Sequence, residues 1–256
     1  MIWMYVPFLL DCFELKGLLG KGTEGEVYLL YDRKECLYVA AKVSKDIDRL
    51  KQQKMWMERL EGRICPRVYG FEMQGEYGIL YMEYVLGETL EQYRMRHGKT
   101  DAKEMADIML KVMEAIEQVH KIGAVYLDVK PSNLYLRTDG RICLLDFGAT
   151  KEEGSYGEML GGTKGYAAPE QFLPGTEADE RCDVYAIGKL MVYLMTDWNP
   201  AYPPYEDPGG LYDLPDFVRE IVLTCTAPDI RKRYRSLHVL EHVLSKSMKK
   251  RCNRNF

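Results

Sequence analysis

The segment Tyr126-Leu127-Asp128-Val129-Lys130-Pro131-Ser132-Asn133 is the part of this sequence from which the architecture can be predicted, together with Asp146-Phe147-Gly148 further on. Between them lie two apolar stretches, 134–136 and 142–145, separated by Thr138-Asp139-Gly140-Arg141. An Asp-Gly pair between two short apolar runs is typical of a β-hairpin. The sequence therefore predicts a β-ribbon that carries polar residues at one end.

The polar residues at that end are two carboxylates, a lysine and an asparagine amide: Asp128, Asp146, Lys130 and Asn133. Phosphoryl transfer needs this set, because one carboxylate orients a hydroxyl, another holds magnesium with an amide, and a cation stabilises the moving phosphate. A polar turn with incidental acids would not need these residue types at fixed offsets. We therefore interpret the hairpin as a phosphoryl-transfer site.

Composition restricts the other classes of function. The chain has 256 residues and a net charge of -4, which argues against nucleic acid as the main partner. Its seven cysteines are scattered and contain no C-x-x-C pair, so we expect free thiols, neither a disulfide framework nor a zinc site. The apolar stretch 2–10 is too short for a membrane span and contains Pro7. These features predict a cytoplasmic protein without a membrane span.

A glycine-rich run, Gly20-Lys21-Gly22-Thr23-Glu24-Gly25, has the G-x-G-x-x-G spacing. That spacing alone is weak, but the flanks at 13–16 and 27–31 alternate like strands, so no helix follows the glycines. This disfavours a dinucleotide-binding turn and favours a glycine hairpin whose backbone amides cover phosphates.

The next predicted strand, 37–42, ends at Lys42 in the V-A-x-K form that positions an ammonium on ATP phosphates. A helix is expected over 47–60, followed by strands near 68–72 and 78–84. In the last of these, Glu83-Tyr84-Val85 would be a hinge whose backbone binds adenine, with Met82 gating the pocket. An ordinary edge strand is the alternative that sequence leaves open.

From Gly87 onward the pattern changes from strands to helices, and we place a boundary there. The prediction is one domain over 1–256, with a first lobe at about 12–86, a second at about 87–248 and a solvated basic tail at 249–256. In the second lobe we expect a mobile polar segment up to Gly162, a Pro-rich loop at 199–208, and helices at 90–96, 102–122, 182–196, 214–226 and 236–248.

Taken together, these motifs resemble the eukaryotic-type protein serine/threonine kinases over essentially the whole chain. Their form is similar to that of bacterial members of the family, and the resemblance implies that this chain is a kinase domain only. The resemblance also covers Ala168-Pro169-Glu170, Asp183, which would pin the backbone of the catalytic segment, and Arg233, which would pair with Glu170. Each motif alone is modest, but their order and spacing together are specific.

The resemblance implies an α+β fold of two lobes. The small lobe would be an antiparallel sheet with one main helix, and the larger lobe would be helical. The implied activity is transfer of the γ-phosphoryl group of Mg-ATP, with Mn²⁺ able to replace Mg²⁺, to Ser or Thr hydroxyls of proteins. No partner beyond ATP and such protein substrates is implied, and the oligomeric state stays open.

The resemblance also implies roles for individual residues. Asp128 would accept the hydroxyl proton, Lys130 would stabilise the phosphoryl group, Thr163 would hydrogen-bond toward both, and Asn133 and Asp146 would hold the metal. The implied nucleotide-binding residues are Leu19, Gly20, Lys21, Gly22, Thr23, Gly25, Val27, Ala40, Lys42, Gln53, Met82, Glu83, Val85 and Tyr135.

The sequence departs from the family pattern at three places. Tyr126 and Leu127 stand where His and Arg usually precede the catalytic Asp, and Glu24 stands at the tip of the glycine loop, where an aromatic residue is common. The third departure is the helix that should present a glutamate to Lys42.

Two registers are possible for that helix. Gln53 with Met57 four residues later keeps the packing and loses the charge, whereas Glu58 with Gly62 keeps the charge and leaves a gap. A buried gap of side-chain size costs about 2–5 kcal/mol, more than the net value of a Lys–Glu pair near water. We therefore expect Gln53 to partner Lys42, with Glu58 as the alternative.

Two other functions are compatible with parts of this pattern. A small-molecule phosphotransferase of the aminoglycoside type would share the fold and both aspartates, but such enzymes generally lack the 163–170 segment, Asp183 and Arg233. A pseudokinase that acts as an ATP-binding signalling module would not need Lys42 and the two aspartates for folding. An active protein serine/threonine kinase is the preferred interpretation; its substrate and pathway stay open.

Overall fold

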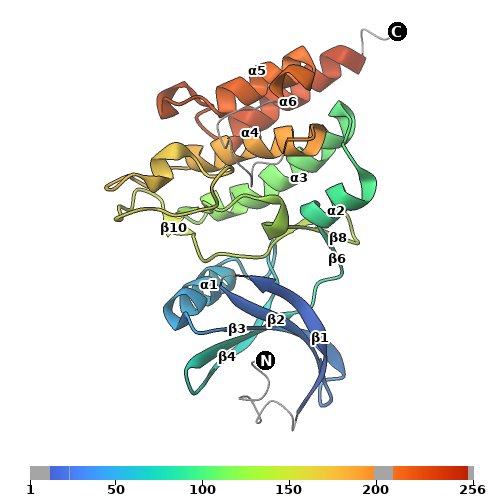
Figure 1. Ribbon diagram of the computed structural model, residues 1–256, viewed down its shortest axis with the longest axis vertical. Helices are drawn as coiled ribbons and strands as arrows, with labels where there is room; N and C mark the ends of the chain where they lie inside the picture. Colours follow the sequence, from blue (N-terminus) through green and yellow to red (C-terminus); the bar gives the residue numbers. More distant parts are fainter. Residues whose placement is uncertain (1–11, 23, 199–209, 253–256) are drawn as a thin grey trace. The chain divides into compact units, whose positions relative to one another are not determined.

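The computed structural model describes residues 12–22, 24–198 and 210–252. The chain folds as two compact units, one up to Leu86 and one from Gly87 onward. Strands dominate the first unit and helices the second (Figure 1). This is the α+β division that the sequence predicts.

The N-terminal unit is built on a five-stranded antiparallel sheet in the order β1-β2-β3-β5-β4. Alternating apolar residues of β2, β3 and β5 form its core, with Leu30, Ala41 and Ile79 fully buried. The strands are β1 Phe13–Gly22, β2 Gly25–Asp32, β3 Leu37–Ser44, β4 Val68–Gln74 and β5 Tyr77–Glu83.

Helix α1, Ile47–Arg59, packs against β4 and β5 of this sheet. Asp46 caps its start, because its carboxylate accepts the Arg49 N–H at 3.1 Å. The buried face consists of Leu50, Gln53, Trp56 and Met57, which recur at helical spacing. The helix does not continue beyond Leu60, because Glu61 and Gly62 both adopt positive φ.

The C-terminal unit is organised around α4, which is buried on nearly every side. A helix that is mostly apolar around its circumference belongs in a core, and α4 contacts α3, α5 and α6 (Figure 1). The helices are α2 Leu90–His97, α3 Ala102–His120, α4 Arg181–Met195, α5 Asp216–Cys225 and α6 Leu237–Cys252.

Two small antiparallel sheets complete this unit. The predicted hairpin is present as β8 and β9, with Leu134 paired to Leu144 and Gly140 at φ +80 in the turn. The first sheet has the order β6-β8-β9 and the second pairs β7 with β10. Their bounds are β6 Gly87–Thr89, β7 Ala124–Val125, β8 Leu134–Arg137, β9 Ile142–Leu144 and β10 Lys151–Glu152.

The structure adds to the sequence-based prediction in one segment and differs from it in another. The segment after Gly148 contains β10, which pairs with β7, and the mobility expected of this segment stays a prediction. Helix α6 continues to Cys252, so the expected solvated tail begins inside a helix. Lys and Arg are good helix formers and are favourable near a helix C-terminus, which explains the extension.

Some predictions fall outside the described residues, namely the Pro-rich loop at 199–208 and the nucleotide-binding role of Thr23. Among the helices that the structure describes, none combines the length and the apolar character needed to cross a bilayer. The cysteines whose side chains are described are free thiols, as expected.

Candidate active site

The backbone of the 126–133 segment is held by a buried carboxylate from α4. Asp183 accepts the N–H of Tyr126 at 2.9 Å and that of Leu127 at 2.8 Å. Leu127 has φ +67, a left-handed conformation that is strained for a branched side chain. Gln171 donates to the Leu127 carbonyl at 3.0 Å, so both polar groups of this strained residue are satisfied.

Asp128 lies at the centre of a hydrogen-bonded set. Its Oδ1 accepts from Thr163 Oγ1 at 2.7 Å, and its Oδ2 accepts from Asn133 Nδ2 at 2.8 Å. Lys130 Nζ lies 2.9 Å from Asp128 Oδ2 and donates to Thr163 Oγ1 at 2.9 Å. The contacts expected of Thr163 are therefore present, and they fix the direction of a largely buried carboxylate.

The two residues expected to hold a metal offer a suitable set of donors. Asn133 Nδ2 also donates to the Asp128 carbonyl at 3.0 Å, so the amide nitrogen faces Asp128. The amide oxygen is then the atom that Asn133 can offer to a cation. One Asp146 oxygen accepts the Gly148 N–H at 2.9 Å, which orients the carboxylate. An amide oxygen with a carboxylate suits a hard divalent cation such as Mg²⁺.

Tyr126 occupies the position where the family usually has histidine. Its ring meets Phe147 edge-on, with 5.3 Å between centroids, and both side chains are fully buried. Burial and the nearby Asp146 and Asp128 carboxylates raise the pKa of Tyr126 well above its usual range, so the phenol stays neutral.

A histidine from another element contacts Asp183: His120, at the end of α3. His120 Nε2 lies 2.8 Å from Asp183 Oδ2, and Nδ1 lies 3.3 Å from Glu180 Oε2. Burial opposes the imidazolium charge, but the two carboxylates outweigh it and raise the pKa of His120 to about 9. His120 is therefore a buried cation at neutral pH.

This arrangement predicts a pH dependence of stability. The pKa of His120 is higher in the folded chain than in the unfolded chain, where it is near 6.5. The contribution of the charged imidazolium to stability is therefore complete below pH 6.5 and is lost as pH rises through about 9. We expect the free energy of unfolding to fall by about 3 kcal/mol over that range. His120→Gln should remove most of this dependence in urea titrations at several pH values. Equal pH dependence in both proteins would contradict the role of His120.

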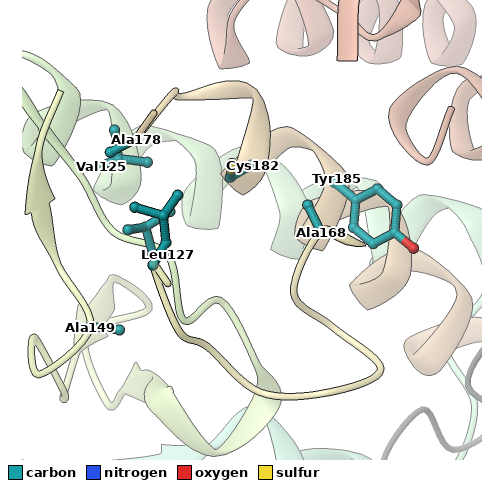
Figure 2. Close-up of a cluster of buried hydrophobic side chains, with 8 residues drawn as sticks. Val125, Leu127, Ala149, Ala168, Ala178, Cys182 and Tyr185 are labelled. Carbon is teal, nitrogen blue, oxygen red and sulfur yellow. The ribbon is translucent and has the colours of Figure 1, made fainter. Parts of the chain in front are cut away.

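Leu127 belongs to an apolar cluster that joins the 126–133 segment to the chain beyond Gly148. Figure 2 shows side chains from the 126–133 segment, from the 148–170 segment and from α4 in one apolar cluster. We call it the Leu127 cluster; its members are Val125, Leu127, Ala149, Leu160, Ala168, Ala178, Cys182 and Tyr185. Apolar packing thus occurs where the family usually has an arginine.

Gln171 connects the same two segments through hydrogen bonds. Its amide nitrogen donates to the carbonyls of Leu127 and Gly161, and its amide oxygen accepts the Ala168 N–H at 2.9 Å. Gly162 passes so close that a Cβ there would lie 2.8 Å from the Gln171 amide nitrogen. Its φ of +116 also favours glycine, so the backbone needs glycine next to Thr163.

The predicted Glu170–Arg233 pair is present and bidentate. Arg233 Nη1 and Nη2 donate to the two Glu170 oxygens at 2.6 and 2.9 Å. The Arg233 side chain is fully buried, and its Nε donates to the Ala227 carbonyl at 2.9 Å. The pair ties the end of the 148–170 segment to the chain that precedes α6.

In the N-terminal unit, the structure places Gln53, not Glu58, beside Lys42. Lys42 Nζ donates to Gln53 Oε1 at 2.7 Å, and Gln53 Nε2 contacts the Met57 sulfur at 3.8 Å. Glu58 instead accepts from Lys54 at 2.7 Å on the exposed face of α1. Gln53 thus takes the position beside Lys42 and Met57 is buried, which is the register that the energetic comparison predicts.

The glycine hairpin is formed by β1 and β2, with Gly22 paired to Gly25 across it and no helix after it. Gly25 is required by the fold, because its φ is +141 and a Cβ would lie 2.2 Å from the Val43 carbonyl oxygen. A Cβ at Gly20 or Gly22 would meet nothing within 4 Å. Packing within the protein therefore gives no reason for glycine at these two positions, whereas close approach of a ligand would.

The other predicted nucleotide-binding residues are distributed over both units. Ala40 pairs with Met82 across β3 and β5, and Val27 pairs with Lys42 across β2 and β3. The Glu83 N–H donates to the Arg67 carbonyl at 2.8 Å, so it is not available as a donor to adenine. Of the remainder, Leu19 and Lys21 are exposed, Val85 is buried, and Tyr135 in β8 donates to the Gly87 carbonyl at 2.8 Å.

Sequence reasoning missed His120 and Gln171. His120 lies outside the motifs, and Gln171 directly follows Ala168-Pro169-Glu170 without a role that the motif predicts; their partners lie far away in the sequence, Asp183 for His120 and Leu127 for Gln171. The sequence shows Glu24 only as a departure from the aromatic residue that is common at the tip of the glycine loop, and it does not predict the contact with Lys42 at 3.4 Å. Each of these contacts depends on tertiary packing.

Comparison with known proteins agrees with this geometry. The chain matches the protein kinase domain family over residues 13–254. It is 27% identical to serine/threonine-protein kinase PknD of Chlamydia muridarum, over 91% of this chain and 31% of that protein. It is 30% identical to serine/threonine-protein kinase PknK of Mycobacterium bovis, over 84% of this chain and 20% of that protein.

A probable serine/threonine-protein kinase of Clostridium perfringens is also 30% identical, over 72% of this chain and 28% of that protein. The chain thus spans about a fifth to a third of the length of the curated relatives that it matches. The family match covers the strands of the first unit and the helices of the second. The chain therefore belongs to the protein kinase family, whose members use ATP with a divalent metal.

Proposed function

We propose that this chain is a protein serine/threonine kinase that transfers the γ-phosphoryl group of Mg-ATP to Ser or Thr hydroxyls of proteins. The observation that carries the proposal is the hydrogen-bonded set of Asp128, Lys130 and Thr163. It joins the residues that would act on a hydroxyl to the segment that ends in the Glu170–Arg233 pair. Such a set is expected of a kinase with a protein acceptor.

In this proposal Asp128 orients the acceptor hydroxyl. Its Oδ1 already accepts a hydrogen bond from the hydroxyl of Thr163, which is the type of donor that a substrate Ser or Thr would supply. The proton of the acceptor hydroxyl moves toward Asp128 as the hydroxyl oxygen attacks the γ-phosphorus of ATP, and ADP leaves. Lys130, whose side chain is 24% exposed, supplies positive charge beside this carboxylate for the transferring group.

Asn133 and Asp146 would hold the metal, and Mg²⁺ is the ion that best fits their oxygen atoms. When bound, the metal neutralises charge on the phosphates. The role of this chain is to orient the two ligands, because Asp128 binds the Asn133 amide nitrogen and the Gly148 N–H binds Asp146. Lys42 and the glycine hairpin would bind the phosphates.

The rival functions differ in what they require. A small-molecule phosphotransferase does not need the 163–170 segment, which in this chain is held by hydrogen bonds with Gln171 and Arg233. A pseudokinase does not need the ordered contacts around Asp128. One experiment distinguishes both of these functions from that of a protein kinase.

That experiment incubates the chain with γ-labelled ATP and Mg²⁺ together with either a mixture of basic and acidic proteins or an aminoglycoside. We expect label on protein Ser or Thr, and none on the aminoglycoside or in Asp128→Asn. Label on the aminoglycoside alone would favour the small-molecule enzyme. ATP binding with no transfer to either acceptor would favour the pseudokinase.

Activity should depend little on phosphorylation of the 148–170 segment. In kinases switched that way, the arginine before the catalytic Asp pairs with the phosphate, whereas here Leu127 packs in the Leu127 cluster. We expect phosphatase treatment to change kcat by less than about threefold. A hundredfold loss would show that another cation has taken the place of the missing arginine.

The contact between Lys42 and Gln53 predicts unequal effects of two substitutions in α1. Glu58→Gln should be nearly silent, because Glu58 is exposed and among the contacts described it pairs only with Lys54, one turn earlier in the helix. Gln53→Leu should lower kcat/KM for ATP about tenfold, because it removes the acceptor that holds the Lys42 ammonium. Steady-state kinetics at varied ATP would test this, with Gln53→Glu expected to retain or raise activity. The opposite ranking of Glu58→Gln and Gln53→Leu would overturn the register.

A further inference from the structure

Glu24, in the turn of the glycine hairpin, shares its carboxylate between two cations of the N-terminal unit. Its Oε2 lies 3.4 Å from Lys42 Nζ, and its Oε1 pairs with the Arg49 guanidinium. The Lys42 side chain is 10% exposed and that of Glu24 is 24% exposed. The contact between Glu24 and Lys42 is therefore partly shielded from water, and charges that are shielded in this way interact more strongly than charges in bulk solvent. The Arg49 side chain is more exposed, at 38%.

The local fold brings these groups together. Gly25 lets the end of the hairpin lie against Val43 in β3, next to Lys42 in sequence. Arg49 and Gln53 are four residues apart on α1, so their side chains project from the same face of the helix. Lys42 is consequently contacted by an amide from the helix and by a carboxylate from the hairpin.

The two contacts differ in charge. Gln53 is neutral, whereas Glu24 brings a formal negative charge to Lys42. ATP would bring phosphates, which are also anions, to the same ammonium. A carboxylate at that position competes for Lys42 and repels the incoming phosphates.

We propose that Glu24 is an internal competitor of the nucleotide: its carboxylate holds Lys42 in the nucleotide-free chain and transfers fully to Arg49 when ATP phosphates bind. The inference rests on the proposed function, specifically on Lys42 as a phosphate ligand. Because Glu24 already pairs with Arg49, it keeps a cationic partner when its contact to Lys42 is lost.

The proposal gives Glu24 and Arg49 opposite effects on ATP affinity. Without its carboxylate, Glu24 cannot compete, and ATP should bind more tightly. Without the Arg49 guanidinium, the carboxylate has Lys42 as its remaining cation among these three residues, and ATP should bind more weakly. A purely structural role for the contact would shift the affinity in the same direction in both variants.

Calorimetric titration of the whole chain with Mg-ATP tests this. Glu24→Gln should lower the Kd about three- to tenfold, and Arg49→Met should raise it about threefold, as expected for a partly shielded ion pair. In the Glu24→Gln background, Arg49→Met should have no further effect. Raising the salt concentration should reduce both shifts.

Glu14→Gln is the matched control, because Glu14 lies in β1 of the same hairpin but pairs with Lys16 at 2.6 Å. It should leave the Kd within about twofold of the parent. The same gain in Glu14→Gln as in Glu24→Gln would reduce the effect to net charge and overturn the proposal. Weaker or unchanged ATP binding in Glu24→Gln, or shifts of the same sign in Glu24→Gln and Arg49→Met, would also overturn it.

Lys42→Met separates failure of this inference from failure of the proposed function. It should weaken ATP binding strongly if Lys42 is the phosphate ligand. A parent chain that does not bind ATP, or binds it equally well after Lys42→Met, would overturn the phosphate role and with it the competitor. ATP binding that depends on Lys42, without a gain in Glu24→Gln, would overturn the competitor alone.

Discussion

Asp128→Asn should lower kcat for phosphotransfer about a thousandfold while the chain stays folded. The amide keeps the size of the side chain and can still accept from Thr163, but it cannot accept the hydroxyl proton. Asp146→Asn should reduce kcat to a similar extent and should also raise the Kd for Mg-ATP, because it removes a formal charge at the metal. The measurements are steady-state kinetics with a protein acceptor and calorimetric titration with Mg-ATP.

Asp139→Asn is the matched control, because Asp139 lies in the turn between β8 and β9 and pairs with Arg141 at 2.7 Å. The same change of charge there should leave kcat within about twofold of the parent. Circular dichroism and thermal unfolding would show that all three variants are folded. Activity of Asp128→Asn within tenfold of the parent would refute the role assigned to its carboxylate.

Arg233→Met should be among the most destabilising single substitutions in the C-terminal unit. It leaves the Glu170 carboxylate, whose side chain is 17% exposed, without the guanidinium that binds both of its oxygens. It also removes the hydrogen bond to the Ala227 carbonyl. Loss of one partner of a buried ion pair costs about 3–5 kcal/mol, which we expect to see in urea unfolding. Because Glu170 ends the 148–170 segment, protein phosphorylation should fall as well.

The nearby Arg231 provides the control for this second prediction. Its side chain is 82% exposed and pairs with Asp229 at 3.0 Å, so Arg231→Met should cost less than about 1 kcal/mol. In Glu170→Gln combined with Arg233→Met no unpaired charge is left, and the double variant should be more stable than Arg233→Met alone. Equal destabilisation by Arg233→Met and Arg231→Met would contradict a specific role for the buried pair.

The sequence by itself determined the parts of this protein that depend on local periodicity and turn chemistry. The glycine hairpin, the β8–β9 hairpin around Gly140 and the register of α1 could all be predicted. Side chains alternate with a period of two in strands and 3.6 in helices, and a positive φ at a turn favours glycine. The contact between Lys42 and Gln53 followed because the packing of Met57 was weighed against a charge on Glu58.

The tertiary structure alone decided which distant side chains meet. It places His120 beside Asp183, Gln171 against the Leu127 carbonyl, and Glu24 between Lys42 and Arg49. It also pairs β10, in the segment after Gly148, with β7, a pairing that the polar, glycine-rich composition of this segment does not indicate. No period or motif encodes these contacts, because each depends on the direction in which two separately packed elements point their side chains.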